Sequence, residues 1–181
     1  MQPEAAWARE LARTLLEESL PRRWIHSQGV AARAESLAAL VGEDADILQA
    51  AAWLHDIGYS PGIAKTGFHP LDGARYLRDL QHANNRLCRL VAYHSCARIE
   101  AEERGLGDVL EGEFPPDHND PLNSPLIYCD MTTDPDGRPV TFDERLEEIL
   151  SRYGDESVVG RSMRKAESAI RSAIRTVTQC S

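Results

Sequence analysis

The chain is 181 residues long, 42% of them hydrophobic, and it carries a formal net charge of −9. A chain of this length can bury one core but is short for two, so we expect a single domain over residues 1–181. No run of about 18 apolar residues is present and the first residues lack a basic and then apolar layout, which argues against a membrane-spanning helix and a signal peptide and predicts a cytoplasmic protein. Basic residues form no stripe with interleaved aromatics, so we do not expect long nucleic acid as a partner. We expect no membrane partner either, because no long apolar run is present, and the oligomeric state stays open.

Helical periodicity runs along almost the whole chain, and no alternating run of β-branched residues is long enough for a strand. We therefore predict an all-α fold. The spacing of apolar residues and the positions of Gly and Pro predict helices over residues 4–19, 21–41, 45–56, 70–80, 84–98, 124–133, 141–153 and 156–178. Whether the helix over 84–98 continues to residue 104 stays open. Thr141 followed by Glu144 has the pattern of a capping box.

Two segments between these helices are predicted to be irregular. Residues 59–70 form the shorter one and begin and end near prolines. Residues 105–123 contain three glycines and three prolines, and we expect either a lid or a mobile loop there.

Four cysteines are scattered along the chain without a Cys-x-x-Cys spacing, which gives no support to a zinc ribbon or a redox motif. We expect reduced thiols at Cys88, Cys96, Cys129 and Cys180.

The dipeptide His55-Asp56 is the most informative feature of the sequence, because it lies within the apolar run AAWLHDIGY. Burying an imidazole beside a carboxylate costs on the order of several kcal/mol unless something compensates them, and a divalent cation does this well. The pair therefore predicts further metal ligands elsewhere in the chain. Suitable imidazoles and carboxylates that border apolar sequence are His26, His69, His94 and Asp130.

These residues stand in five segments that read RWIHSQGV, WLHDIG, FHPLDGARYL, YHSCAR and IYCDMTTDPDGR. In these segments the chain resembles the HD-domain metal-dependent phosphohydrolases, whose signature is a histidine, a distant His-Asp pair and a later aspartate. It looks most like the dinuclear members with two additional histidines, in a layout similar to that of the symmetrical dinucleoside tetraphosphate hydrolases. The resemblance covers roughly residues 20–150 and implies a single HD-domain helical bundle on which the first and last helices pack.

The resemblance implies a site for two divalent metal ions, with their identity open among Fe, Mn, Co, Ni, Zn and Mg. The resemblance implies that one ion is bound by His26, His55, Asp56 and Asp130. It also implies that Asp56 bridges to a second ion, which His69 and His94 hold. Asp56, His69 and His94 then take the catalytic positions. Two cations about 3.5 to 4 Å apart can share a bridging hydroxide, lower its pKa and neutralise phosphate oxygens during in-line attack.

Candidate substrate contacts lie close to these ligands in the sequence. Arg98 falls on the helix face of His94 if the helix continues, and it matches an arginine of the resembling hydrolases. Tyr59 stands where those hydrolases usually carry a lysine, and Lys65 is our candidate for the replacement cation. The predicted phosphate contacts are Lys65, Thr66, Ser95, Arg98 and Arg138, whereas His82 and His118 match nothing and are expected at the surface.

The sequence thus predicts a metal-dependent phosphohydrolase that acts on a nucleotide or another small phosphorylated metabolite through metal-activated hydroxide. The same ligand set also fits a mixed-valent di-iron oxygenase, because some relatives with two additional histidines cleave organophosphonates or inositol oxidatively. A third interpretation is a non-catalytic HD-like signalling module, although such modules typically lack the ligands that are all present here.

Overall fold

The structure is a computed structural model that describes residues 4–180. Within these residues no strand is present beyond an isolated bridge between Thr133 and Pro139, so the predicted all-α class is confirmed. The α-helices are α1 (Glu4–Leu16), α2 (Pro21–Ser36), α3 (Ala38–Val41), α4 (Ala45–Leu54), α5 (His69–Asp79), α6 (Asn85–Tyr93), α7 (Ala97–Glu103), α8 (Gly107–Glu113), α9 (Asn123–Met131), α10 (Phe142–Tyr153) and α11 (Val158–Gln179). Three short 3-10 turns are η1 (Gly42–Asp44), η2 (Ile57–Tyr59) and η3 (His94–Cys96). Residues 1–3 and 181 belong to the predicted domain but lie outside the described residues.

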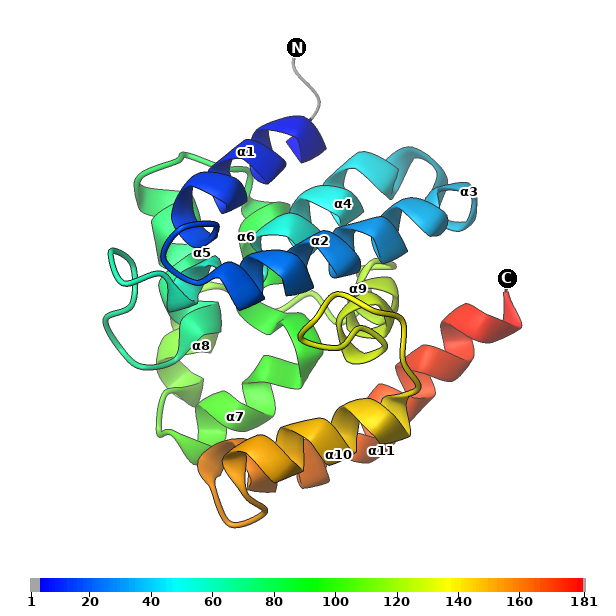
Figure 1. The fold of residues 1–181 in the computed structure, drawn as a ribbon. Helices are drawn as coiled ribbons and strands as arrows, with labels where there is room; N and C mark the ends of the chain where they lie inside the picture. Colours follow the sequence, from blue (N-terminus) through cyan, green and yellow to red (C-terminus); the bar gives the residue numbers. More distant parts are fainter. Residues whose placement is uncertain (1–3, 181) are drawn as a thin grey trace.

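The helix α4 lies at the centre of the larger core cluster. Its sequence is almost wholly apolar, and Leu48, Ala51 and Leu54 are fully buried. The helices α1, α2, α6 and α9 all pack against it, and Figure 1 shows α1, α2 and α4 side by side. Because α4 is enclosed on several sides, its C-terminal end carries the next residues, His55 and Asp56, into the interior of the protein.

A second core cluster joins α9, α10 and α11. Buried residues recur along α11 at Met163, Ala166 and Ile170, a spacing that presents one helix face to its neighbours. Figure 1 shows α10 (orange) and α11 (red) lying together, across the molecule from α1. The helix α9 contributes Cys129 to the larger cluster and Met131 to the second one, so the residue between them, Asp130, lies where the two clusters meet.

The helix predicted over residues 84–98 is broken in the structure, which corrects that prediction. The helix α6 ends at Tyr93, and Ser95 and Cys96 take left-handed backbone angles with φ of 51° and 61°. This conformation is rare without glycine, so tertiary contacts must hold it. One such contact is the hydrogen bond that the Ser95 hydroxyl donates to Asp130, 35 residues further along the chain.

Two further segments differ from the predictions. The helix expected over residues 21–41 is interrupted at Leu37, which leaves helical geometry (φ −92°, ψ 2°) and packs into the larger core cluster; helical structure resumes as α3 and ends at Val41, as expected. The segment 105–123 is less irregular than expected, since it contains α8 between the left-handed Gly105 and the buried Phe114. A lid function for this segment stays a prediction.

Several smaller expectations are confirmed. The Thr141 hydroxyl accepts a hydrogen bond from the Glu144 backbone amide, and the Glu144 carboxylate accepts one from the Thr141 amide, which completes the capping box of α10. Each of the four cysteines is a free thiol. Among the described helices, none combines the length and the hydropathy that crossing a bilayer would require.

Candidate metal centre

His26 of α2 faces Asp130 of α9. Its Nδ1 lies 2.9 Å from the Asp134 carbonyl oxygen, and its Nε2 lies 3.0 Å from Asp130 Oδ1. A glycine makes this approach possible, because a Cβ at Gly29 would lie 2.5 Å from the Gly137 carbonyl oxygen. The close contact between α2 and the turn at Gly137 therefore places a carbonyl acceptor beside the His26 ring.

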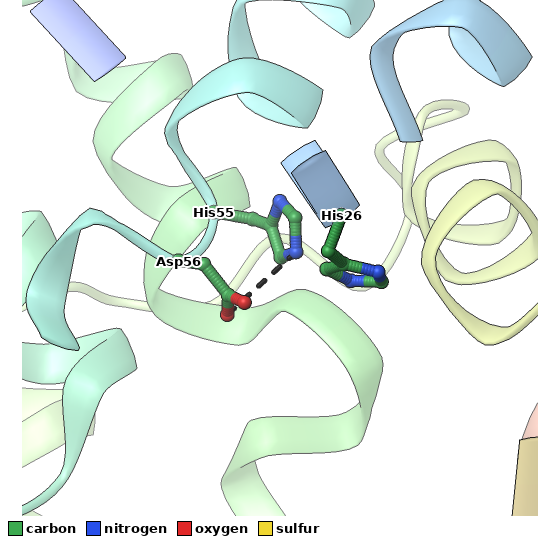
Figure 2. Close-up of side chains that lie close together, drawn as sticks. All are labelled: His26, His55 and Asp56. Carbon is green, nitrogen blue, oxygen red and sulfur yellow. Dashed lines mark ion pairs between the residues drawn. The ribbon is translucent and has the colours of Figure 1, made fainter. Parts of the chain in front are cut away.

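His55 is fully buried at the end of α4 and has one ring nitrogen without a partner. Its Nδ1 lies 2.7 Å from the Ala52 carbonyl oxygen, whereas no hydrogen-bond partner for Nε2 is present in residues 4–180. Nε2 lies 3.6 Å from Asp56 Oδ1 and 3.8 Å from Asp130 Oδ1. Figure 2 shows the side chains of His26, His55 and Asp56 close together, with the ion pair between His55 and Asp56 dashed. A buried polar atom of this kind is costly, and a metal ion on Nε2 would satisfy it.

A second pair of histidines lies on the other side of Asp56. His69 Nε2 is 3.3 Å from Asp56 Oδ1 and 3.1 Å from His94 Nε2, and His94 Nδ1 is 2.7 Å from the Val91 carbonyl oxygen. Gly58 allows α5 to come this close, because a Cβ there would lie 1.9 Å from the His69 carbonyl oxygen. The glycine that follows the His-Asp pair is therefore what brings His69 beside Asp56.

These donors fit divalent metal ions in both geometry and tautomer. His26, His55 and His94 each have Nδ1 within hydrogen-bond distance of a backbone carbonyl, and donation from Nδ1 leaves the Nε2 lone pair as the metal-binding atom. Nε2 of His55 has no other partner in the described residues, whereas Nε2 of His26 contacts Asp130 and Nε2 of His94 contacts His69, which are themselves potential ligands. Potential ligand atoms gather in two groups, each within 4.8 Å, and Asp56 belongs to both: His26, His55 and Asp56 form one, and Asp56, His69 and His94 form the other. Asp130 lies beside the first group through its contact with His26.

The electrostatics of the cluster favour the protonation states that metal binding requires. Burial lowers the pKa of His55 and lowers the pKa of His69 further, so both imidazoles stay neutral near pH 7. Burial would raise the pKa of Asp56, but His55 and Arg23 hold that pKa well below its ordinary value. Burial would raise the pKa of Asp130 as well, but the hydrogen bond with His26 and the charges of His55, His26 and Arg145 together lower it. Neutral imidazoles and ionised carboxylates are the forms that bind metal.

Arg23 is a functional candidate that the sequence analysis missed. Its Nη1 lies 2.7 Å from Asp56 Oδ2, and its guanidinium carbon lies 3.3 Å from the centre of the Tyr59 ring. The Tyr59 ring in turn stacks on His69 with ring centres 3.9 Å apart. Arg23 therefore supplies a cation beside Tyr59, where the resembling hydrolases carry a lysine. The available signal was its position three residues before His26, on the same side of a predicted helix.

All the predicted ligands except His55 line a cavity of about 80 Å³, and the structure brings only one of the predicted substrate contacts to it. Ser95 lines the cavity and donates to Asp130. Arg98 lies outside it and pairs with Glu111 of α8, because the break after Tyr93 turns α7 away from the direction of α6. Lys65, Thr66 and Arg138 are exposed and also lie outside the cavity, so their contact with substrate stays a prediction; His82 and His118 are exposed, as expected.

Two more arginines line the same cavity and were not identified from the sequence. Arg145 and Arg152 come from α10, where they share one helix face with Ile149 and Tyr153. Their spacing of four and three residues around Ile149 was the available signal. They were missed because they lie beyond the last of the five matching segments.

The fold and the site define an all-α protein with a buried cluster of histidine and aspartate side chains suited to divalent metals. A family model described as HD domain matches residues 23–127. This match covers more than half of the chain, so the protein belongs to the HD-domain family. The matched residues include His26, His55, Asp56, His69 and His94 and end before Asp130. No curated protein and no solved structure matched the chain.

Proposed function

We propose that this HD domain is a metal-dependent phosphohydrolase with a two-metal site, which acts on a nucleotide or another small phosphorylated metabolite. The observation that supports it most is the position of Asp56. Its Oδ1 lies 3.6 Å from His55 Nε2 and 3.3 Å from His69 Nε2, between the two groups of potential ligands. Its other oxygen, Oδ2, is held by Arg23. One carboxylate oxygen is thus positioned to serve both groups.

In this proposal His26, His55, Asp56 and Asp130 would hold one ion, and His69 and His94 would hold the second. When bound, divalent ions neutralise charge on phosphate oxygens and make a nearby water more acidic. The protein's own residues orient the ligands: carbonyl groups fix the rings of His26, His55 and His94, and the Ser95 hydroxyl fixes the second oxygen of Asp130. Asp56, His69 and His94 are the proposed catalytic residues, because they face the same cavity.

The proposal is tested by hydrolysis assays on protein that is stripped with a chelator and reloaded with manganese, iron or cobalt. The substrates are nucleoside mono-, di- and triphosphates and a symmetrical dinucleoside tetraphosphate. The tetraphosphate tests whether the resemblance to the dinucleoside tetraphosphate hydrolases extends to their substrate. We expect metal-dependent hydrolysis that Asp56→Ala lowers by more than about 100-fold, since losing even a residue that only supports a metal ligand costs about 10- to 100-fold.

The matched control is Asp136→Ala, which removes an exposed carboxylate outside the cavity and should leave hydrolysis unchanged. Hydrolysis that survives Asp56→Ala would contradict the proposal. An iron-loaded protein that hydrolyses none of the substrates but consumes oxygen with an organophosphonate would replace it by the oxygenase alternative.

A further inference from the structure

Three arginines surround the candidate metal cavity, although the whole chain is acidic. Arg23 comes from α2, and Arg145 and Arg152 come from α10. Arg23 is already paired with Asp56, which belongs to the ligand cluster. Within the described residues, the ion pairs of Arg145 and Arg152 are made with Glu148 and not with a metal ligand, although the charge of Arg145 helps to lower the pKa of Asp130.

Arg145 has a buried donor without an acceptor. Its side chain is 8% exposed, and its Nη1 pairs with Glu148 one helical turn further along α10. Its Nε is buried and has no hydrogen-bond partner in the described part of the chain. A guanidinium that is buried with an unsatisfied N–H is costly, and an anion in the adjoining cavity would satisfy it.

Arg152 shares its counter-ion with Arg145. Its Nε lies 3.1 Å from Glu148 Oε1, so a single carboxylate faces two guanidinium groups. The two arginines and Glu148 together carry one net positive charge beside the cavity, which Glu100 also lines. Planar guanidinium groups bind phosphate and carboxylate groups through paired N–H donors.

The helix α10 lies beyond the family match, as Asp130 does. The family match ends at residue 127, whereas α10 spans Phe142–Tyr153. Phe142, Leu146 and Ile149 anchor α10 in the second core cluster. The arginines are therefore held by packing on a helix that the matched region does not include.

We propose that Arg145 and Arg152 form an anion subsite, so that the preferred substrate carries two anionic groups: the phosphoryl group that reacts at the metal ligands and a second phosphate or carboxylate held by α10. This inference rests on the proposed function. Both sets of residues line one cavity of about 80 Å³, so the two anionic groups must lie close together in the substrate. A diphosphate satisfies this condition, and so does a phosphate within a few bonds of a carboxylate.

The kinetic test compares phenyl diphosphate with phenyl phosphate on the metal-loaded protein. A hydrogen bond to a charged group is worth about 1.5–3 kcal/mol, so we expect Arg145→Gln and Arg152→Gln each to lower kcat/KM for phenyl diphosphate by at least about tenfold, mainly through KM. For phenyl phosphate, kcat/KM should change by less than about threefold in both variants. If either arginine has only a structural role, its substitution would lower kcat/KM equally for both substrates, and this result would overturn the proposal. Phosphoglycolate shows whether a carboxylate serves as the second anion.

Arg145→Lys and Arg171→Gln are the controls. The lysine variant keeps the charge but not the planar donors, so it should recover part of the loss. Arg171 contacts α10 through Asp143 but lies outside the cavity, so Arg171→Gln should leave the preference for phenyl diphosphate intact. An equal loss in Arg171→Gln would also overturn the proposal.

A binding experiment separates this proposal from the proposed function. Methylenediphosphonate and methylphosphonate, which are not hydrolysed, are titrated into the protein by calorimetry in magnesium buffer. We expect the diphosphonate to bind more tightly, with an advantage that falls by about tenfold in Arg145→Gln and Arg152→Gln and persists in Arg171→Gln. If no substrate is hydrolysed but this pattern appears, the function is wrong and the subsite is right. If hydrolysis occurs but the tighter binding of the diphosphonate is equal in all variants, the proposed anion subsite is refuted and the proposed function stands.

Discussion

His55 contains the least satisfied polar atom of the candidate metal centre, and this makes a prediction about pH. Burial lowers the pKa of His55 in the folded protein, so at acidic pH the unfolded chain binds a proton that the folded chain does not. In the metal-free protein the stabilising effect of the neutral imidazole is therefore complete above a pH of about 6.5, the ordinary pKa of histidine, and is lost progressively as the pH falls below it.

The measurement is thermal unfolding in the presence of a chelator, between about pH 7.5 and pH 5.5. We expect the midpoint temperature of the wild type to fall as the pH is lowered. The midpoint temperature of His55→Leu should fall less, because this variant lacks one of the titrating groups. His69 contributes in the same direction, since burial lowers its pKa as well. His82→Leu is the control, because His82 is exposed. A wild type that gains stability as the pH falls over this range would contradict the account.

Arg23 makes a second residue-scale prediction, because it compensates the same carboxylate as a metal ion would. Its ion pair with Asp56 is mostly buried, with side chains 24% and 6% exposed. Arg23→Gln should destabilise the metal-free protein by about 2 kcal/mol and the manganese-loaded protein by less, because bound metal then offsets the charge of Asp56. Urea unfolding with and without manganese measures both values.

The control for this prediction is the neighbouring Arg22→Gln, since Arg22 forms an exposed ion pair with Asp136 and should matter little in either state. Equal destabilisation by Arg23→Gln with and without metal would show that Asp56 is not a metal ligand.

At the scale of elements, the approach of η2 to α5 fixes the second group of ligands. A Cβ at Gly58 would lie 1.9 Å from the His69 carbonyl oxygen and 2.8 Å from the Gly73 backbone nitrogen. Backbone atoms cannot yield as a flexible side chain can, so α5 must shift. Gly58→Ala should therefore cost about 1–3 kcal/mol of stability and weaken the metal site of His69 and His94 more than the site of His26 and His55.

Metal titration followed by mass spectrometry under native conditions tests this expectation. The alanine variant should retain one tightly bound ion per chain where the wild type retains two. Gly62→Ala is a matched control, because a Cβ there meets nothing within 4 Å. If Gly58→Ala binds both ions as tightly as the wild type, the contact between η2 and α5 does not position His69.

Most of the helices could be predicted from the sequence, because the periodicity of apolar residues and the positions of Gly and Pro are local properties. The largest error is the predicted helix across His94 to Arg98. The apolar spacing of LCRLVAYHSCARIE continues through the break, whereas the contacts that hold the break are made with Asp130, far along the chain. No local pattern contains that information.

The same distinction applies to the candidate site. The six predicted metal ligands lie in short segments with a recognisable pattern, and the structure brings all six together. Arg98 was placed by assuming a continuous helix, and it lies elsewhere. Arg23, Arg145 and Arg152 reach the cavity through tertiary packing, which sequence spacing describes only as a helix face.

At the scale of the whole molecule, the candidate centre lies where two core clusters meet. The larger cluster, around α4, provides His55 and Asp56, and the second cluster holds α10 with its arginines. The chain has a net charge of −9, yet the cavity is lined by three arginines and the ligands favour bound cations. Asp56, Glu100 and Asp130 balance the three arginines in this lining, so bound cations would make the cavity positive, and a positive cavity would attract small anions.

The central claim is that Asp56 serves both groups of ligands, and metal content tests it most directly. Purified wild type, Asp56→Ala and Asp136→Ala are dialysed against manganese and analysed for metal per chain, with circular dichroism to confirm that each variant is folded. We predict about two ions in the wild type and in Asp136→Ala and none in folded Asp56→Ala, because the bridging ligand is shared. Two tightly bound ions in folded Asp56→Ala would contradict the account.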